Sequence, residues 1–274
     1  MKCFYHKSDL DGHASGAIVR QNNPECETIG VDYNDTLDSL GMVGEFQPGE
    51  LVFVVDFSFS LKDMEYLNDH TKLVWIDHHK SAIEKCESIS CAGVREIGKA
   101  GCELTWQYIN PRSTPRVIKL LGRYDVWDHS NPDVLPFQYG FRTLENTLPD
   151  SDIWEYYLLP NPGGVDEVIR VGNIILNYER KQNEIYAKGM HYESEFEGLR
   201  AIVINRAFQN SKIFDSVYDP EKHDIMVLFG VKPGEFKYSL YSTKPEIDVS
   251  KIAVKYGGGG HAGAAGFYSK IQVI

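Results

Sequence analysis

Residues 72–79 read KLVWIDHH, and this stretch decides the fold expected for the chain. Its apolar run LVWI is typical of a strand that is buried on both faces, and an acid and two histidines follow it directly. Residues 51–56, LVFVVD, repeat this arrangement, and shorter strands are expected over 2–5 and 28–31. Helix-like stretches alternate with these strands, which predicts parallel βαβ units with helices on both faces of the sheet; they cover residues 14–21, 60–68, 100–109 and 116–124.

The remainder of the chain divides into three parts. Residues 131–164, rich in Pro, Asn and Asp, are expected to be irregular, and a long helical pattern follows over 166–188. The sequence therefore predicts a first α/β domain (1–165), a linker helix (166–195) and a smaller second α/β domain (196–274). Within the second domain we expect strands over 200–205, 224–231 and 235–242 and a helix over 248–256.

Composition excludes several classes of protein. The 274 residues include 28 basic and 39 acidic side chains, a net charge of −11, which argues against binding of duplex nucleic acid by a basic surface. No apolar run reaches the roughly 18 residues of a membrane-spanning helix, so no membrane partner is expected. Five cysteines without a CxxC pair argue against a thiolate zinc site and favour a reducing, cytoplasmic location.

Acids and histidines follow three of the predicted strands. In parallel α/β sheets ligands bind beyond the carboxyl ends of the strands, so these side chains should meet at one edge. Each alone is more often a turn former or a helix cap, but a cluster of carboxylates needs neutralising cations. Oxygen donors mixed with imidazoles suit Mn²⁺, Mg²⁺ or Fe²⁺, and two such ions support displacement at phosphorus. The candidates are His6, Asp9, Asp11, Asp56, Asp77, His78, His79 and Asp125.

A glycine cluster, GGGGHAG over 257–263, forms a second candidate site. It satisfies G-x-G-x-x-G formally, but it follows a helix-like stretch, whereas a dinucleotide motif follows a strand. A flexible turn is the simple alternative. Because glycine has no Cβ, backbone amides can approach a phosphate closely, and a histidine can add a donor. We therefore expect a phosphate cradle formed by Gly258, Gly259, Gly260 and His261.

Together these motifs resemble the DHH–DHHA1 phosphoesterase superfamily, in particular its oligoribonuclease-like, exopolyphosphatase-related branch. Five segments occur in the family's order: HKSDLDG (6–12), VVDFS (54–58), IDHH (76–79), LGRYDVWDH (121–129) and GGGGHAGAAGF (257–267). The resemblance covers nearly the whole chain and implies a metal-binding domain followed by a substrate-binding domain.

The resemblance also implies roles for individual residues. His6, Asp9 and Asp56 would hold one ion. Asp56 would bridge to a second ion, which the resemblance assigns to Asp11, Asp56, His78 and Asp125, with Mn²⁺ the preferred metal. Asp128 competes with Asp125 for that position in the motif.

Catalysis and substrate binding are assigned in the same way. His79 would contact the scissile phosphate, and Asp77 would support the histidines. Tyr241 stands where oligoribonuclease-like relatives carry an arginine, so it would stack on a base or donate one hydrogen bond.

The expected function is a metal-dependent phosphodiesterase that cleaves short oligonucleotides or linear dinucleotides to mononucleotides. One alternative is a phosphatase that acts on a bisphosphorylated nucleotide, pyrophosphate or polyphosphate. A remote alternative is a nucleotide-binding sensor without turnover. The expected partner is a short oligonucleotide or a nucleotide, and a homodimer is compatible with this interpretation.

Overall fold

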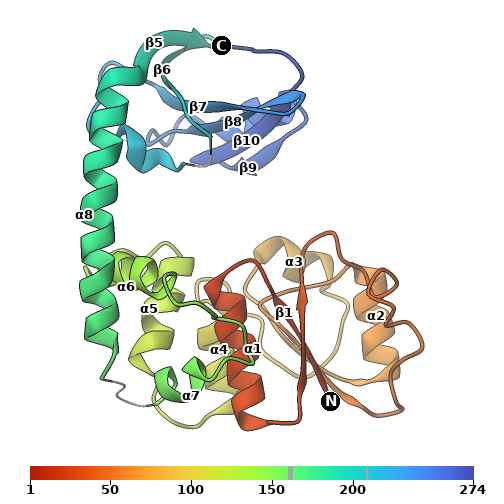
Figure 1. Cartoon of the computed structure of the whole chain (residues 1–274). Helices are drawn as coiled ribbons and strands as arrows, with labels where there is room; N and C mark the ends of the chain where they lie inside the picture. The colour runs from red at the N-terminus through yellow and green to blue at the C-terminus, as the bar shows by residue number, and fades with distance from the viewer. Residues whose placement is uncertain (160–162, 208) are drawn as a thin grey trace. The chain divides into compact units, whose positions relative to one another are not determined.

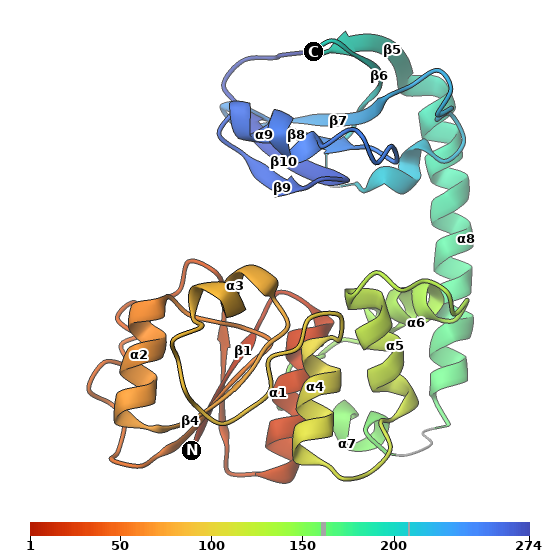
Figure 2. The same ribbon diagram turned by 180° about the vertical axis from the view of Figure 1, so that it is seen from behind.

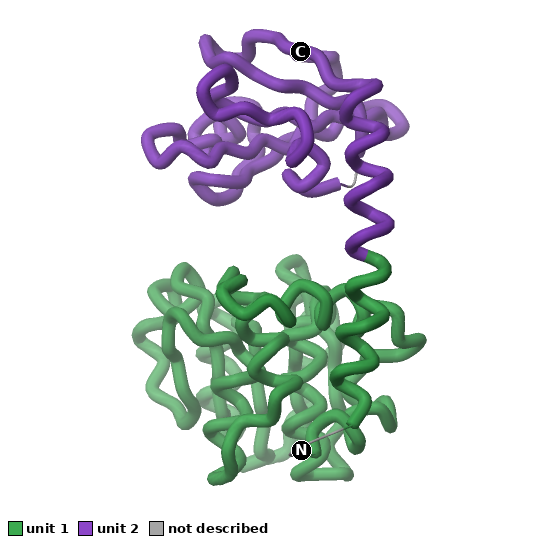
Figure 3. Tube along the Cα trace, turned by 90° about the vertical axis from the view of Figure 1, so that its left-hand side faces the viewer, with its two compact units in different colours: residues 1–175 green, residues 176–274 purple. Residues whose placement is uncertain are grey.

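The computed structural model describes residues 1–159, 163–207 and 209–274. Two compact units make up the chain, Met1–Ile175 and Leu176–Ile274 (Figure 3). Within the described ranges, no helix combines the length and the apolar character that crossing a membrane would require.

The first unit is built on a four-stranded parallel sheet with the order β2-β1-β3-β4. Figure 1 labels its strand β1 and the helices around the sheet. The apolar runs of the sequence form its strands as predicted, because each strand is covered on both sides. The strands are β1 (Lys2–His6), β2 (Glu27–Val31), β3 (Leu51–Val55) and β4 (Lys72–Ile76).

Helices cover both faces of this sheet. On one face Met64 and Leu67 pack against the strands, and on the other face Val19 and Leu104 do so. Met64 and Leu67 belong to α2, Val19 belongs to α1 and Leu104 belongs to α4. The predicted α/β class with helices on both faces of the sheet is therefore confirmed. The bounds are α1 (Leu10–Asn22), α2 (Leu61–His70), α3 (Lys80–Lys85), α4 (Gly101–Ile109) and α5 (Arg116–Asp125).

The prediction that residues 131–164 are irregular was wrong. This segment contains α6 (Val134–Phe141) and α7 (Ile153–Tyr157). Pro136 lies in the first turn of α6, where a backbone N–H has no helical partner, so it does not prevent the helix. Phe141 packs against Trp154 with ring centroids 5.4 Å apart, so tertiary contacts stabilise both helices despite the turn-like composition.

Helix α8 (Val165–Met190) begins in the first unit and ends in the second, and the division between the units falls within it. The expected linker helix ran to residue 195. Instead the helix ends at Met190, because residues 191–196 form strand β5 (His191–Phe196), which pairs antiparallel with β6 (Leu199–Asn205).

The second unit is a six-stranded sheet with the order β5-β6-β7-β8-β10-β9 (Figure 2). Among the strands that the structure describes in this unit, β6 and β7 are the one parallel pair. Ile252 and Ala253 of α9 pack on one face, and Ile213 and Phe214 pack on the other. The remaining elements are the 3-10 helix η1 (Ser211–Phe214), β7 (Ile225–Lys232), β8 (Glu235–Tyr241), α9 (Val249–Lys255), β9 (Gly259–His261) and β10 (Ala264–Ser269).

Candidate metal centre

The carboxyl ends of three parallel strands carry the candidate side chains of the first unit. His6 is the last residue of β1, Asp56 follows β3, and residues 77–79 follow β4. Asp9 caps α1 by accepting a 2.9 Å hydrogen bond from the amide of Gly12. Helix α1 therefore starts at the same edge of the sheet and brings further carboxylates to it.

The first group of side chains consists of His6, Asp9 and Asp56. The Nδ1 atom of His6 lies 2.9 Å from Oδ2 of Asp9 and 3.9 Å from Oδ2 of Asp56. Burial alone would raise the pKa of Asp9, but hydrogen bonds from His6 and from the Gly12 amide lower it overall. This carboxylate is therefore held in its charged form.

The second group is arranged around His78. Its Nε2 atom lies 3.2 Å from Oδ1 of Asp56, 3.3 Å from Oδ2 of Asp125 and 3.6 Å from Oδ2 of Asp11. The two oxygens of Asp56 thus face different groups, which is the geometry of a bridging carboxylate. Three overlapping sets of these side chains could each hold a metal ion: His6, Asp9 and Asp56; Asp56, His78 and His79; and Asp11, His78 and Asp125.

Asp56 has an unusual backbone conformation. Its φ of 53° lies in the left-handed region, which side chains other than glycine seldom adopt. Its amide donates to the carbonyl of Ile76 at 2.9 Å, which ties β3 to β4 at this point. Strain of this kind is typical of functional sites, where surrounding contacts hold it in place.

Helix α4 also begins against this centre. A Cβ added to Gly101 would lie 2.6 Å from the Cβ of Asp56, so only glycine allows this approach. The amides of Gly101 and Cys102 each donate to a carboxylate oxygen of Asp11 at 2.8 Å. The start of α4 therefore orients Asp11 and leaves room for Asp56.

The electrostatics of the centre favour a bound cation. Burial, followed by the charges of Asp11 and Asp9, raises the pKa of Asp56 well above its usual value and that of Asp125 to about 8. Among the described residues, both carboxylate oxygens of Asp56 and Nε2 of His78 are buried without a hydrogen-bond partner. Burial lowers the pKa of His78, which favours the neutral ring that ligates metals. The donor set therefore fits divalent ions.

Both carboxylate oxygens of Asp77, unlike those of Asp56, accept hydrogen bonds. Its Oδ1 atom accepts from the amides of His78 (2.7 Å) and His79 (3.1 Å) and from Nδ1 of His79 (2.7 Å), and its Oδ2 atom accepts from Ser58. Burial opposes charge on His79, yet its bond to Asp77 raises the pKa of the ring overall. Asp77 thus positions the histidines and keeps His79 protonated over a wider pH range.

The two acids of the LGRYDVWDH segment differ clearly. Asp125 ends α5 and faces His78, as described above. Asp128 accepts from the amide of Ser130 at 3.0 Å and lies 3.6 Å from Nε of Arg123, outside the two groups. The structure therefore brings Asp125, rather than Asp128, to the centre.

The structure also adds Tyr33, which the sequence analysis did not consider. Its ring centroid lies 5.1 Å from that of His6. The signal that could have identified it is its position, because it follows the strand 28–31 as the other candidates follow their strands.

In the second unit, His261 and Tyr241 lie in one row across the sheet. Ala264 pairs with both, with His261 on β9 and with Tyr241 on β8. Residues that pair across strands point to the same face, so His261 and Tyr241 share a face with a small residue between them. The hydroxyl of Tyr241 donates to the carbonyl of Gln209 at 3.3 Å.

The glycines of this cluster differ in their surroundings. A Cβ on Gly258 would lie 2.1 Å from the carbonyl oxygen of Gly266, and one on Gly260 would lie 2.5 Å from Cα of Ala265. Both are therefore required for β9 to approach β10. A Cβ on Gly259 would meet nothing within 4 Å, so this position is open.

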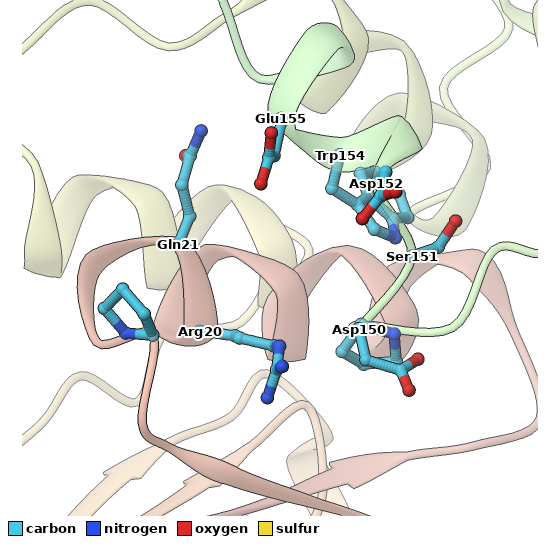
Figure 4. A pocket seen from close by; sticks show the side chains of 9 residues that line it. Arg20, Gln21, Asp150, Ser151, Asp152, Trp154 and Glu155 are labelled. Carbon is cyan, nitrogen blue, oxygen red and sulfur yellow. The ribbon is translucent and has the colours of Figure 1, made fainter.

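A separate cavity of about 420 Å³ lies between the end of α1 and the start of α7 (Figure 4). Arg20 is one of its charged residues, and it donates to the carbonyl of Cys26 at 3.0 Å. None of the candidate ligands lines the cavity, which is formed by Arg20, Gln21, Pro24, Pro149, Asp150, Ser151, Asp152, Trp154 and Glu155.

Sequence comparison relates the chain to a viral protein. The chain matches no protein-family model. It is 28% identical over 227 residues to the uncharacterized protein R106 of Acanthamoeba polyphaga mimivirus, an alignment that covers 78% of this chain and 52% of R106. The chain thus spans about half the length of that curated relative.

Solved structures share the architecture over nearly the whole chain. One is the pGpG-specific phosphodiesterase PggH from Vibrio cholerae, with a TM-score of 0.58 and 10% identity, covering 97% of this chain and 92% of PggH. Another is the DHH domain of a protein described as belonging to a family of ribosomal proteins, with a TM-score of 0.58, 15% identity and coverage of 98% and 82%. A third is an exopolyphosphatase-related protein from Bacteroides fragilis, with a TM-score of 0.52, 14% identity and coverage of 99% and 87%. The chain therefore shares its fold with these proteins, one of which is described as a DHH domain.

Proposed function

We propose that the protein is a metal-dependent phosphodiesterase that hydrolyses short oligonucleotides or linear dinucleotides to mononucleotides. The observation that carries this proposal is the position of Asp56 between His6 and His78, with buried carboxylate oxygens that have no hydrogen-bond partner among the described residues. The name of the Vibrio cholerae protein, which has the same fold, specifies a linear dinucleotide as its substrate.

Two divalent ions, preferably Mn²⁺, would complete the centre. His6, Asp9 and Asp56 would hold one ion, and the second would be held by Asp11, Asp56, His78 and Asp125. When bound, such ions neutralise phosphate charge and lower the pKa of water. The carboxylates would then be ionised, because the cations remove the repulsion that raises the pKa of Asp56 and Asp125.

His79 would supply a proton-bearing donor to the phosphate. Its Nδ1–H donates to Asp77, so Nε2 is the ring nitrogen left for substrate. The raised pKa of His79 favours the form in which Nε2 also carries a hydrogen. This donor would stabilise the negative charge that increases on the phosphoryl oxygens during hydrolysis.

The second unit would bind another part of the substrate. Its row of His261, Ala264 and Tyr241 offers an imidazole and a phenol ring on either side of a small residue. A Cβ added to Gly259 would meet no heavy atom within 4 Å, so the space next to this row is open. These features suit a phosphate and a base better than a bare inorganic anion.

A hydrolysis panel with Mn²⁺ tests the proposal. The substrates are a linear dinucleotide, a five-nucleotide RNA, a bisphosphorylated nucleotide, pyrophosphate and polyphosphate, and the products are separated by chromatography. We expect mononucleotides from the first two substrates. Phosphate release from pyrophosphate, polyphosphate or the bisphosphorylated nucleotide without cleavage of either oligonucleotide would favour the phosphatase alternative instead. Tight nucleotide binding by the Mn²⁺-loaded protein without any hydrolysis would favour the sensor.

A further inference from the structure

Strand β2, at the edge of the first sheet, also brings side chains to the candidate metal centre. Strand β2 pairs parallel with β1, and the register matches Val31 with His6. The amide of Lys7 donates to the carbonyl of Val31 at 3.0 Å, so the two strands remain paired up to their carboxyl ends. The residues that follow Val31, including Tyr33, therefore emerge beside His6.

Tyr33 contacts the centre from its exposed side. Its ring centroid lies 5.1 Å from that of His6, 5.9 Å from that of Phe57 and 6.4 Å from that of His79. The residue is nevertheless 65% exposed, unlike Phe57, which is buried. Tyr33 thus borders the centre without filling the core.

The hydroxyl of Tyr33 lies next to the histidine that faces the substrate. Its oxygen is 3.5 Å from Nε2 of His79, the ring nitrogen that Asp77 leaves available. Two donors at this spacing can bond to oxygens of one tetrahedral phosphate, because each N–H or O–H group spans about 2.8 Å to its acceptor. The backbone nearby is fixed, since the amide of Tyr33 donates to Asp32, which also accepts from Ser8.

We propose that Tyr33 contacts the substrate, with its hydroxyl donating a hydrogen bond to a non-bridging oxygen of the scissile phosphate beside His79. This inference rests on the proposed function and adds a catalytic residue from the edge strand. It also explains why a tyrosine stays exposed against two histidines and a buried phenylalanine.

The decisive variant is Tyr33→Phe, which keeps the ring against His6 and Phe57 and removes only the oxygen. We expect kcat/KM for a linear dinucleotide to fall roughly 10- to 100-fold, the effect of losing one donor to a charged phosphoryl group. Affinity for a mononucleotide, measured by calorimetry with Mn²⁺ present, should fall roughly fivefold. The number of Mn²⁺ ions bound per chain and the melting temperature should not change.

One further variant separates the effect of the ring from that of the hydroxyl, and another serves as a control. Tyr33→Leu removes both the ring and the hydroxyl and should be at least as impaired as Tyr33→Phe. Tyr108→Phe removes the hydroxyl of another exposed tyrosine of the first unit and should behave like the wild type.

Several results would overturn the inference. An active Tyr33→Phe beside an impaired Tyr33→Leu would assign the effect to the ring, and two active variants would remove any role. Loss of Mn²⁺ from Tyr33→Phe would indicate an effect on the metal centre instead. If the wild type cleaves no oligonucleotide, the proposed function fails. Mononucleotide binding still tests Tyr33 in that case, and equal affinities of the wild type and Tyr33→Phe would overturn its role.

Discussion

The two units of the chain carry their candidate sites in opposite ways. In the first unit, carboxylates and imidazoles from distant segments meet at the carboxyl ends of buried strands, and the carboxylate oxygens of Asp56 have no hydrogen-bond partner among the described residues. In the second unit, neighbouring strands present His261, Ala264 and Tyr241 on an open sheet face. We therefore propose that the first unit sets the rate of the chemical step and that the second unit sets the affinity for substrate.

The largest effect is predicted for Asp56→Asn, which tests the role of the first unit in the chemical step. This substitution keeps the shape of the side chain but removes the charge that both side-chain groups share. We expect kcat to fall by on the order of 10³-fold or more, because both ion sites lose a ligand. Hydrolysis of a linear dinucleotide with Mn²⁺ measures the effect.

Asp128→Asn is the matched control for Asp56→Asn. Asp128 lies outside both groups, so its variant should keep the wild-type rate within about twofold, as surface substitutions usually do. A rate for Asp56→Asn within tenfold of the wild type would contradict the bridging role.

Asp77→Asn tests the support of His79. Asparagine no longer stabilises the protonated ring, so the pKa of His79 should fall. We expect kcat to drop roughly 10- to 100-fold, the usual effect of removing a group that orients a functional histidine. Histidine NMR signals followed against pH give the pKa directly, and an unchanged titration of His79 would argue against this role.

His261→Ala tests the role of the second unit in substrate affinity. It removes an exposed donor of the second unit that is not among the candidate ligands, so KM should rise roughly tenfold while kcat changes little. His191→Ala changes another exposed histidine of this unit and should leave both constants unaltered. A loss confined to kcat would mean that the second unit takes part in the chemical step.

The smallest predicted effect concerns the metal-free protein and its dependence on pH. An aspartate of the unfolded chain has a pKa of about 3.9, whereas the pKa of Asp125 in the fold is about 8. Between these values the folded state keeps a proton that the unfolded state loses, so stability should fall as pH rises from about 4 to about 8. The difference of about four pKa units corresponds to roughly 5–6 kcal/mol, so at roughly 2–4 °C per kcal/mol we expect the melting temperature to drop by roughly 10–20 °C.

Calorimetry in the presence of a chelator measures this slope. Asp125→Asn should make the slope shallower, and Asp128→Asn should leave it unchanged. Equal slopes for all three proteins would show that Asp125 does not carry a raised pKa.

Much of the first unit could be predicted because its signals are local. LVFVV and KLVWI are continuously apolar and form β3 and β4, and the parallel topology then brings the residues that follow them to one edge. The convergence of Asp56 and His78 follows from these two facts alone. The choice of Asp125 over Asp128 came from the motif, and the structure adds the geometric reason.

Other features depend on tertiary contacts that no local pattern encodes. Helix α6 forms in a segment of turn-like composition because Phe141 packs into the core. The left-handed backbone of Asp56 and the close approach of Gly101 appear only once α4 lies against the strand end. Tyr33 went unnoticed because an aromatic residue after a short edge strand resembles an ordinary loop residue.

Counting Mn²⁺ ions per chain tests the central claim most directly. Equilibrium dialysis followed by elemental analysis should give two ions per chain for the wild type and for Asp128→Asn, and fewer than one for Asp56→Asn. A wild-type protein that retains no Mn²⁺, or an Asp56→Asn variant that retains two ions, would contradict a centre built around Asp56.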